Sequence, residues 1–405
     1  MLRPAHLPMV LLLIAAIPAL AAPDARGDRE FIDLDREFGR ILAEESVPGA
    51  AWAIVRDGRI VHASGYGERA RGSRQPVTAE TVFRVASVSK TFSATLTAML
   101  VGEGLLHWDD AISRFVPKFQ LDHPDHARRL QIRHLLGQST GIVPNAYDNL
   151  LDASQSLEQI VPRFAEIEPM CRPGQCYTYQ NVLFSLVEPA IEQTTGRSYG
   201  QLLDERLFQP LGMEQASTGM AAFLASANRA RPHVRRGSQW LTTKVDGNYY
   251  RVSPAAGVNA SALDLGRWLI GQMGDRPDVI RPELAAELTR KRVRTARELR
   301  RKGWRDLLTD AHYGLGWRIY TIGDEEIFMH SGWVRGFVAQ IAYSRDRRTG
   351  LAIVLNAESS ALNEIATHFW RQALAEPLML VQDERRAPES GSGEVTTAAA
   401  VGSGE

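Results

Sequence analysis

Hydrophobic and polar positions recur with two different periods along the chain, and this predicts a mixed α/β fold. Residues 31–44 carry apolar side chains at helical spacing, and the apolar, alanine-rich run 87–103 predicts a buried helix. Residues 49–67 predict two strands joined at Asp57-Gly58, a dipeptide that is typical of a tight hairpin turn. The sheet is therefore expected to begin as an antiparallel pair.

The middle and the end of the chain differ in their patterns. Residues 105–230 are dominated by helical stretches and turns, with the clearest helical patterns at 132–136, 157–164, 182–195 and 199–211. Strand patterns return later, followed by a final helix; the strands are expected at 313–320, 326–329, 337–343 and 351–355, and the helix at 360–382.

These patterns predict an antiparallel sheet flanked by helices, with an inserted, mostly helical domain. The α/β domain would be discontinuous, built from residues 22–104 and 231–382, and the helical domain would cover 105–230. Residues 383–405 are rich in Gly, Ser, Ala and Glu, and they predict a disordered tail.

The first 21 residues have the composition of a signal peptide. Basic Arg3 precedes an apolar run from 8 to 20, and Ala19-Leu20-Ala21 is a small-x-small cleavage pattern. We therefore expect cleavage after Ala21 or Ala22 and a periplasmic or secreted protein. The alternative is a retained membrane anchor, but the run is shorter than the roughly 20 residues that a spanning helix needs.

Charge and motif content exclude several classes of function. The formal net charge is zero, so no overall field attracts nucleic acid or an acidic membrane. Glycine-rich phosphate loops and HExxH pairs are both absent from the sequence, so we expect no cofactor and no metal. Residues 290–305 hold nine basic residues against one Glu; they could face anionic envelope polymers, but a solvated surface loop is favoured.

The two cysteines, Cys171 and Cys176, flank a Pro-Gly turn that could bring their sulfur atoms together. In an exported protein this spacing favours a disulfide, and a pair of buried reduced thiols is the alternative. With no Cys or His cluster nearby, a zinc site is disfavoured.

The strongest candidate for chemistry is the pair Ser87 and Lys90, one helical turn apart. Lysine is rare, since only five of the 47 basic residues are lysines. An arginine guanidinium does not lose its proton, whereas a desolvated amine can become a neutral base near pH 7. Lys90 could therefore take the proton of the Ser87 hydroxyl and make it a nucleophile.

Further motifs follow in a fixed order, and together they resemble the superfamily of serine β-lactamases, penicillin-binding proteins and family VIII esterases. The resemblance is nearest to the class C β-lactamase and D-alanyl-D-alanine carboxypeptidase branch and spans residues 47–375. The segments that carry it are Phe83 to Phe92, Tyr179-Gln180-Asn181, His330-Ser331-Gly332, His134 to Gly141, Pro254 to Leu265 and Tyr313 to Trp317.

The resemblance implies a β-lactamase/transpeptidase-like fold and a role for each motif. Ser87, Lys90 and Tyr179 would be catalytic, and a phenol near cations is expected to have a lowered pKa and to pass a proton to the leaving group. Asn181 and the segment His330, Ser331 and Gly332 would bind substrate. The oxyanion hole would be formed by the backbone N–H groups of Ser87 and Trp333.

His330 departs from the Lys-Thr-Gly pattern of many members. Because histidine is mostly neutral near pH 7, we hypothesise that Arg335 supplies the missing cation to a substrate carboxylate. The expected activity is hydrolysis, through an acyl-enzyme, of D-amino-acid peptides, β-lactams or small esters. The alternative is a non-hydrolytic penicillin-binding sensor or a protein that binds cell-wall fragments. The sequence does not predict the oligomeric state.

Overall fold

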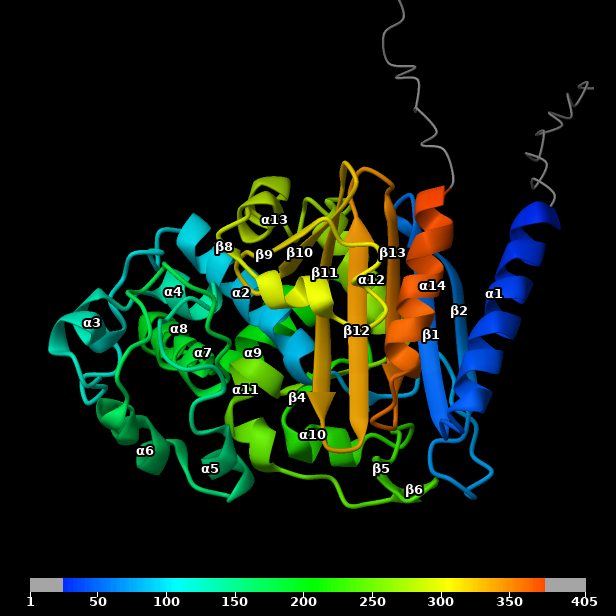
Figure 1. The fold of residues 1–405 in the computed structure, drawn as a ribbon, viewed down its shortest axis with the longest axis horizontal. Helices are drawn as coiled ribbons and strands as arrows, with labels where there is room; N and C mark the ends of the chain where they lie inside the picture. Colours follow the sequence, from blue (N-terminus) through cyan, green and yellow to red (C-terminus); the bar gives the residue numbers. More distant parts are fainter. Residues whose placement is uncertain (1–24, 376–405) are drawn as a thin grey trace, which may run out of the picture.

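The centre of the protein is an eight-stranded antiparallel sheet, which a computed structural model describes within residues 25–375 (Figure 1). The strand order is β2-β1-β13-β12-β11-β10-β9-β8. In chain order the strands are β1 (Gly49–Arg56), β2 (Arg59–Gly67), β8 (Val293–Arg294), β9 (Asp310–Tyr313), β10 (Arg318–Ile322), β11 (Glu325–Val334), β12 (Phe337–Ser344) and β13 (Thr349–Leu355).

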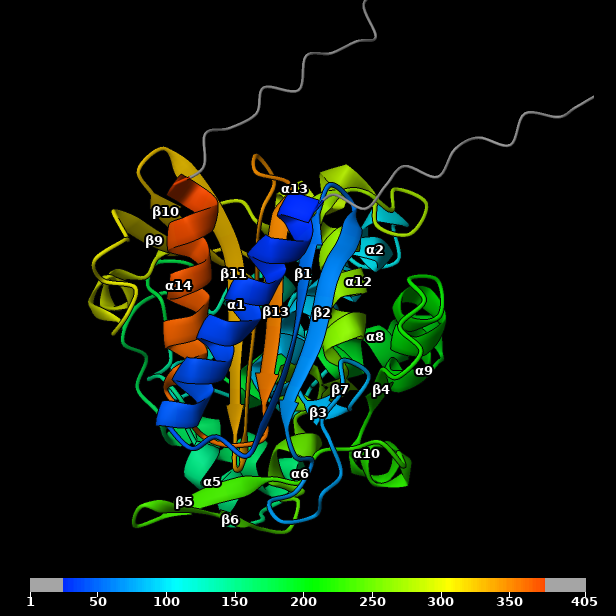
Figure 2. The ribbon, with the colours of Figure 1, turned by 90° about the vertical axis from the view of Figure 1, so that its right-hand side faces the viewer.

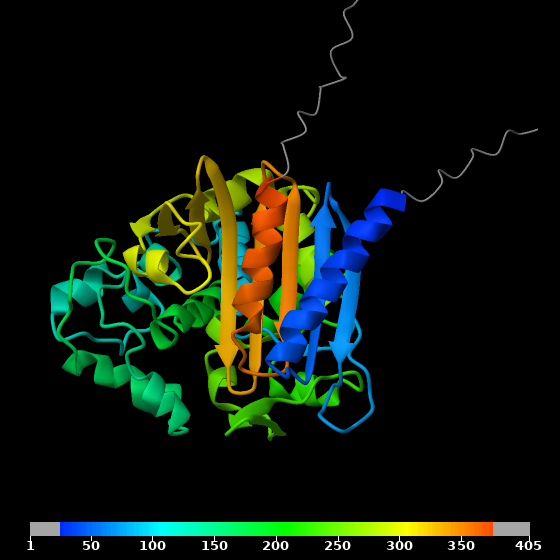
Figure 3. The ribbon, with the colours of Figure 1, turned by 45° about the vertical axis from the view of Figure 1, so that its right-hand side comes forward.

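Two helices cover one face of this sheet, α1 (Ala25–Glu44) and α14 (Ala361–Ala375), which lie side by side in Figures 2 and 3. The strands alternate between two cores because successive side chains point to opposite faces. On β13, Ile353 packs with Trp370 under the two helices, whereas Val354 joins the core on the opposite face.

The opposite face carries α12 (Ala262–Met273) and α2 (Ser89–Gly102). Beside them lies a mostly helical region with α3 (Pro124–Arg129), α4 (Ile132–Leu136), α5 (Asp148–Asp152), α6 (Leu157–Ile160), α7 (Val182–Ser185), α8 (Val187–Thr195) and α9 (Tyr199–Leu203). The other helices are α10 (Met220–Ala225), α11 (Ser253–Ala256) and α13 (Pro282–Leu288). Single 3-10 or π turns complete the chain: η1 (Ala86–Val88), η2 (Ile112–Arg114), η3 (Val161–Glu166), η4 (Asp204–Phe208), η5 (Asn248–Arg251) and η6 (Ala296–Arg300).

Two small sheets accompany the large one. In the first, β7 (Val258–Ala260) lies between β3 (Phe83–Arg84) and β4 (Ser217–Thr218); in the second, β5 (His233–Arg236) pairs with β6 (Gln239–Thr242). The antiparallel α/β architecture with flanking helices is confirmed, and so is the opening hairpin. The division into two domains stays a prediction.

The single strand expected at 313–320 is wrong, because this segment forms β9, a turn and β10. Gly316 makes the turn with a φ of +74°, a conformation that glycine adopts without strain. A Cβ atom there would lie 2.6 Å from the carbonyl oxygen of Lys90. The glycine therefore lets the β9–β10 turn pack directly on α2.

The helix expected at 87–103 begins two residues later, at Ser89, and Ser87 lies on the preceding turn η1. The predicted leader 1–21 and tail 383–405 fall outside the described residues, as does the end of the last predicted helix, 376–382. Within residues 25–375, no helix is both long and apolar enough to cross a membrane.

Ile353 tests the packing of the sheet under α1 and α14. It is fully buried on β13, so Ile353→Ala should lower the free energy of unfolding by about 2–5 kcal/mol through lost apolar burial and a cavity. The matched control is Ile32→Ala on α1, where the side chain is 56% exposed and the change should be small. Urea titrations of both variants would measure the difference, and equal losses would contradict this packing.

Candidate active site

The nucleophile candidate, Ser87, lies on the turn between β3 and α2 and is partly exposed. Ala86 directly before it has a φ of 48°, an unfavourable conformation for a residue with a Cβ atom. This conformation sits next to the only residue of the turn that is not buried. The backbone is therefore bent at the point where the Ser87 hydroxyl becomes accessible.

Lys90 is fully buried on α2, and its amine has three oxygen neighbours. The Nζ atom lies 3.2 Å from the Ser87 hydroxyl, 2.7 Å from Asn181 Oδ1 and 3.1 Å from the carbonyl oxygen of Ala255. Two of these neighbours are carbonyl oxygens, which only accept hydrogen bonds.

Burial, reinforced by the positive charge of Arg318, holds the pKa of Lys90 well below the usual 10.5, and Asp148 opposes this shift only in part. A neutral amine has two N–H donors and one lone pair. When the donors bind Asn181 Oδ1 and the Ala255 carbonyl, the lone pair points to the Ser87 hydroxyl. The geometry thus suits a neutral Lys90 that accepts the Ser87 proton.

The loop that carries Tyr179 and Asn181 is held by the buried side chain of Gln138. The side chain of Gln138 accepts from the Gln180 backbone N–H at 2.6 Å and donates to the Gln180 carbonyl at 3.0 Å. This pairing fixes the loop on both sides of Gln180. It explains why the segment His134 to Gly141, which contains Gln138, accompanies the Tyr-x-Asn motif in the sequence.

Asp148 on α5 fixes the orientation of Asn181, a contact that the sequence analysis missed. Its Oδ2 accepts from Asn181 Nδ2 at 2.7 Å, so Asn181 Oδ1 must face Lys90. Burial raises the pKa of Asp148, while the hydrogen bond from Asn181 and the proximity of Lys90 oppose this shift. The sequence carries no signal for this contact, because Asp148 begins a helix of only five residues that was not predicted.

The expectation of a lowered pKa for Tyr179 is wrong. Burial raises the pKa of this phenol above its usual value, and the opposing effects of Arg318 and of the hydrogen bond with Ser87 are too small to reverse the shift. Tyr179 is therefore a neutral phenol at neutral pH. It can donate a proton but does not start as a base.

His330 is buried on β11 and neutral, as expected for this residue. Burial lowers its pKa well below the usual 6.5, and the cation of Arg318 adds to the shift. Nδ1 lies 2.9 Å from the carbonyl oxygen of Ser331, an acceptor, so Nδ1 carries the proton. Nε2 then accepts from the Tyr313 hydroxyl at 3.0 Å.

The cation beside His330 is Arg318, which the sequence analysis also missed. Its guanidinium lies 5.6 Å from the Tyr179 ring and 5.8 Å from the Tyr313 ring, and it pairs with Glu298 at 2.6 Å. Burial alone would raise the pKa of Glu298, but Arg318 and Arg301 hold it below the usual value. Arg318 directly follows the Tyr313 to Trp317 motif, so the motif was the available signal.

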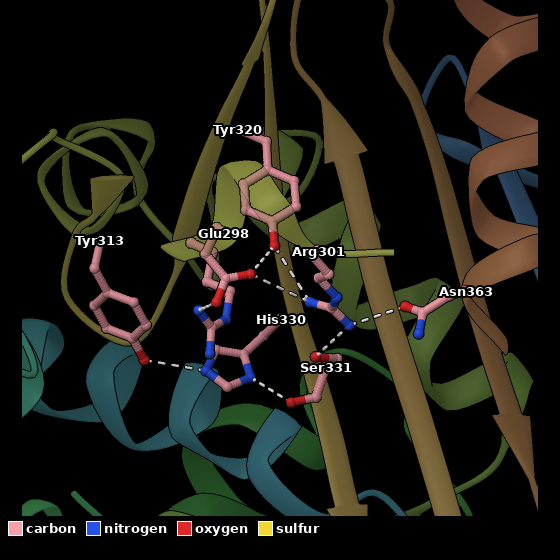
Figure 4. Close-up of polar contacts among 8 residues, drawn as sticks. Glu298, Arg301, Tyr313, Tyr320, His330, Ser331 and Asn363 are labelled. Carbon is pink, nitrogen blue, oxygen red and sulfur yellow. Dashed lines mark hydrogen bonds and ion pairs between the residues drawn. The ribbon is translucent and has the colours of Figure 1, made fainter. Parts of the chain in front are cut away.

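The basic segment 290–305 is only partly the solvated loop that its composition favoured. Figure 4 shows Arg301 between Glu298 and Ser331. Arg301 donates to the Ser331 hydroxyl at 3.2 Å and to Asn363 Oδ1 at 2.9 Å. The segment therefore supplies the Glu298 carboxylate and the Arg301 guanidinium, and Arg301 connects this ion pair to Ser331 of the His330-Ser331 motif.

Gly332 brings β11 directly against the nucleophile. A Cβ atom there would collide with the Val85 carbonyl oxygen and lie 2.9 Å from the Ser87 nitrogen, so only glycine fits. The peptide leading into Trp333 thus lies beside Ser87, while the Trp333 indole is 61% exposed and donates to Glu358. The oxyanion-hole role of Ser87 and Trp333 stays a prediction.

Two pockets lie on either side of these residues. One, of about 540 Å³, is lined by Tyr179 and Arg318. The other, of about 300 Å³, contains Arg335 at the end of β11 and Arg84 from β3. The structure therefore places Arg335 in a different pocket from Tyr179. The hypothesis that Arg335 supplies a cation to a substrate carboxylate stays a prediction.

Cys171 and Cys176 are joined by a disulfide with an S–S distance of 1.96 Å. The bridge closes the loop that leads into Tyr179. The Gly174 N–H donates to the Ser139 carbonyl at 2.8 Å, and the Met170 N–H donates to the Gly141 carbonyl at 2.7 Å. The loop is thereby attached to the segment that also holds Gln138.

The chain is similar in sequence to several known proteins. The chain is 24% identical to Protein flp of Staphylococcus aureus strain MW2 over 81% of its own length, and it spans 63% of that protein. It is 33% identical to Penicillin-binding protein 4 of Amycolatopsis lactamdurans, over 45% of this chain and 47% of the relative.

The fold is shared with the octameric penicillin-binding protein homologue from Pyrococcus abyssi, with a TM-score of 0.77 at 24% identity. The match covers 86% of this chain and 78% of that structure. The Beta-lactamase family matches residues 34–375, which is most of the chain. The chain therefore belongs to the Beta-lactamase family, within the superfamily of serine β-lactamases and penicillin-binding proteins.

Proposed function

We propose that this protein is an exported serine hydrolase that forms an acyl-enzyme at Ser87 and releases it to water. The observation that carries the proposal is the surrounding of Lys90, whose two carbonyl neighbours leave a lone pair for the Ser87 hydroxyl. Family membership supports a serine hydrolase in general, and the finer steps follow from this geometry.

In the acylation step, the Ser87 oxygen attacks the acyl carbon while its proton moves to Lys90 Nζ. The charge that develops on the substrate oxygen would be stabilised by the backbone N–H groups of Ser87 and Trp333. A neutral Lys90 starts this step without first losing a proton to water. The resulting ammonium then lies beside Asn181 Oδ1 and the Ala255 carbonyl, which already accept from it.

Tyr179 would complete the proton transfer. As a neutral phenol hydrogen-bonded to Ser87, it can give its proton to the leaving group and regain one from the Lys90 ammonium. The bond between the acyl carbon and the leaving group breaks in this step. In deacylation the same groups act in reverse, and water takes the place of the leaving group.

The substrate would be a small-molecule or peptide acyl compound: a D-amino-acid peptide, a β-lactam or a small ester. Asn181 and the His330-Ser331-Gly332 strand would bind it in the cleft. Export is supported by the composition of the first 21 residues and by the Cys171–Cys176 bridge, since disulfides persist in oxidising compartments.

The second candidate is a sensor that is acylated without turnover. One observation favours it: Lys90 is fully buried and donates to Asn181 and Ala255, so a deacylating water can reach its amine only from the Ser87 side. A sensor would release at most one equivalent of product per protein molecule, whereas a hydrolase would release many.

Exposure to benzylpenicillin tests the acyl-enzyme. Intact-mass spectrometry should show either a covalent adduct or loss of the drug. Ser87→Ala should abolish both, because among residues 25–375 Ser87 carries the only hydroxyl that is hydrogen-bonded to the Lys90 amine. The control is Ser113→Ala, in the helical region, which should behave as the parent protein. An adduct that persists in Ser87→Ala would refute the proposed nucleophile.

The pH dependence of ester hydrolysis tests the role of Lys90. Only the neutral amine accepts the Ser87 proton, so kcat/KM should rise with pH through the lowered pKa of Lys90. Lys90→Arg should lower kcat/KM by about 10²–10⁴-fold and remove this rise, because arginine stays protonated.

The matched control for this experiment is Lys118→Arg, an exposed lysine of the helical region. It should leave both the rate and the pH profile unchanged. If Lys90→Arg kept the parent profile, Lys90 would not be the base.

A further inference from the structure

Arg84 is a buried cation that forms no direct ion pair with a carboxylate of residues 25–375. It lies on β3, three residues before Ser87, and its side chain is 1% exposed. The guanidinium stacks on the Tyr250 ring at 4.0 Å and donates one hydrogen bond, from Nη1 to the Asp246 carbonyl at 2.6 Å. Within residues 25–375, its Nε and Nη2 atoms have no hydrogen-bond partner. Arg84 forms no ion pair among these residues, and the charge of Asp246 offsets the effect of burial on its pKa only in part.

A buried guanidinium with unpaired donors destabilises the folded protein unless a ligand binds to those donors. A guanidinium offers five N–H donors, and removing an unpaired charge from water carries a large penalty. Burial lowers the pKa of Arg84, but an arginine side chain remains charged at neutral pH. An anionic group that reached Nε and Nη2 would supply the missing partner and form charge-assisted hydrogen bonds.

Arg84 lines the 300 Å³ pocket together with Arg335, Asn248 and Tyr249. Arg335 is exposed at the turn that follows β11, so its side chain is free to move toward a ligand. The pocket thus offers one fixed and one mobile guanidinium. Its volume is at the lower end of that of small-molecule sites.

The position of the pocket assigns it to one side of the scissile bond. Along β11, His330 faces Tyr313 and Tyr179, and Gly332 touches Ser87. Arg335 directly follows the end of β11, three residues beyond Gly332, which is a separation of at most roughly 10 Å. Because Tyr179 would protonate the leaving group, the far side of Ser87 receives the acyl group.

We propose that Arg84 and Arg335 form a subsite that selects acyl groups ending in a carboxylate. The inference rests on the proposed acyl-enzyme at Ser87 and names the class of its acyl donor: a dicarboxylic or acidic amino-acid acyl chain. Two carboxylates, Asp152 and Asp246, also line the pocket and would favour a cation. Asp152 is exposed to water, however, and Asp246 accepts from the Asn248 N–H at 2.7 Å, so neither lacks a partner as Arg84 does.

The test compares three p-nitrophenyl esters of equal chain length: the hexanoate, the half-ester of adipic acid and the ester of the corresponding ω-amino acid. In the parent protein, kcat/KM should be highest for the adipate half-ester. Arg335→Gln and Arg84→Gln should each lower the adipate-to-hexanoate ratio by about tenfold or more, since each removes a charge-assisted hydrogen bond. Arg371→Gln, an exposed change on α14 across the sheet, should leave the ratio as in the parent.

The outcomes separate this inference from the proposed function. A preference for the ω-amino ester, or a ratio that neither substitution lowers, would overturn the subsite while Ser87-dependent hydrolysis remained. Hydrolysis that survives in Ser87→Ala would instead overturn the acyl-enzyme and the subsite with it. Should Arg84→Gln fail to fold, Arg335→Gln at the exposed turn decides the question alone.

Discussion

The site depends on the burial of the Lys90 amine, which removes this amine from water. Lys90 is fully buried, and a buried ammonium without partners would cost several kcal/mol, so the amine is most stable when neutral. Its two donors then need acceptors, which Asn181 and Ala255 supply from segments far apart in the sequence. The fold must hold these segments at fixed distances from α2, and much of the surrounding structure serves that requirement. Gln138 holds the Asn181 loop from one side, and Asp148 fixes the amide from the other.

The positive charge of Arg318 also favours the neutral form of Lys90. Arg318 stays protonated among three aromatic rings, and its field disfavours a further proton on Lys90 or His330. An uncompensated guanidinium at this depth would itself be unstable, and Glu298 provides the counter-charge from the basic segment. Because Glu298 also binds Tyr320 and pairs with Arg301, the charge pattern is tied to β10 and β11 (Figure 4). The electrostatics of the nucleophile therefore depend on a segment that contributes no residue to the reaction itself.

The sequence was sufficient for most of the sheet and the main helices, because these rest on local patterns, and it identified motifs that the fold brings together around Ser87. The Asp57-Gly58 turn signal predicted β1 and β2, and apolar runs separated by a polar turn predicted β12 and β13. The residue types and spacing identified Ser87, Lys90 and Tyr179 as candidates. Prediction from the sequence failed for properties that depend on contacts between residues far apart in the chain. The pKa of Tyr179 follows from burial that only packing creates, and Glu298 looked like one acid in a basic loop until the chain folded. The break at Gly316 was missed for the same reason, since its cause is the close approach of α2.

The charges of the site also limit what its substrate recognition can rely on. His330 is neutral with its Nδ1 proton bound to the Ser331 carbonyl, so the strand that lines the cleft presents no cation of its own. Arg318 and Arg301 already share Glu298, and Arg301 has further bonds to Ser331 and Asn363. A substrate anion that approached either would compete with an existing carboxylate. Arg84 forms no such ion pair among residues 25–375, and its Nε and Nη2 atoms have no hydrogen-bond partner, although Asp152 and Asp246 line the same pocket. The proposed subsite on the Arg84 side of Ser87 would therefore be the more favourable place for a substrate anion. It lies away from His330, the residue that stands in place of the lysine of Lys-Thr-Gly.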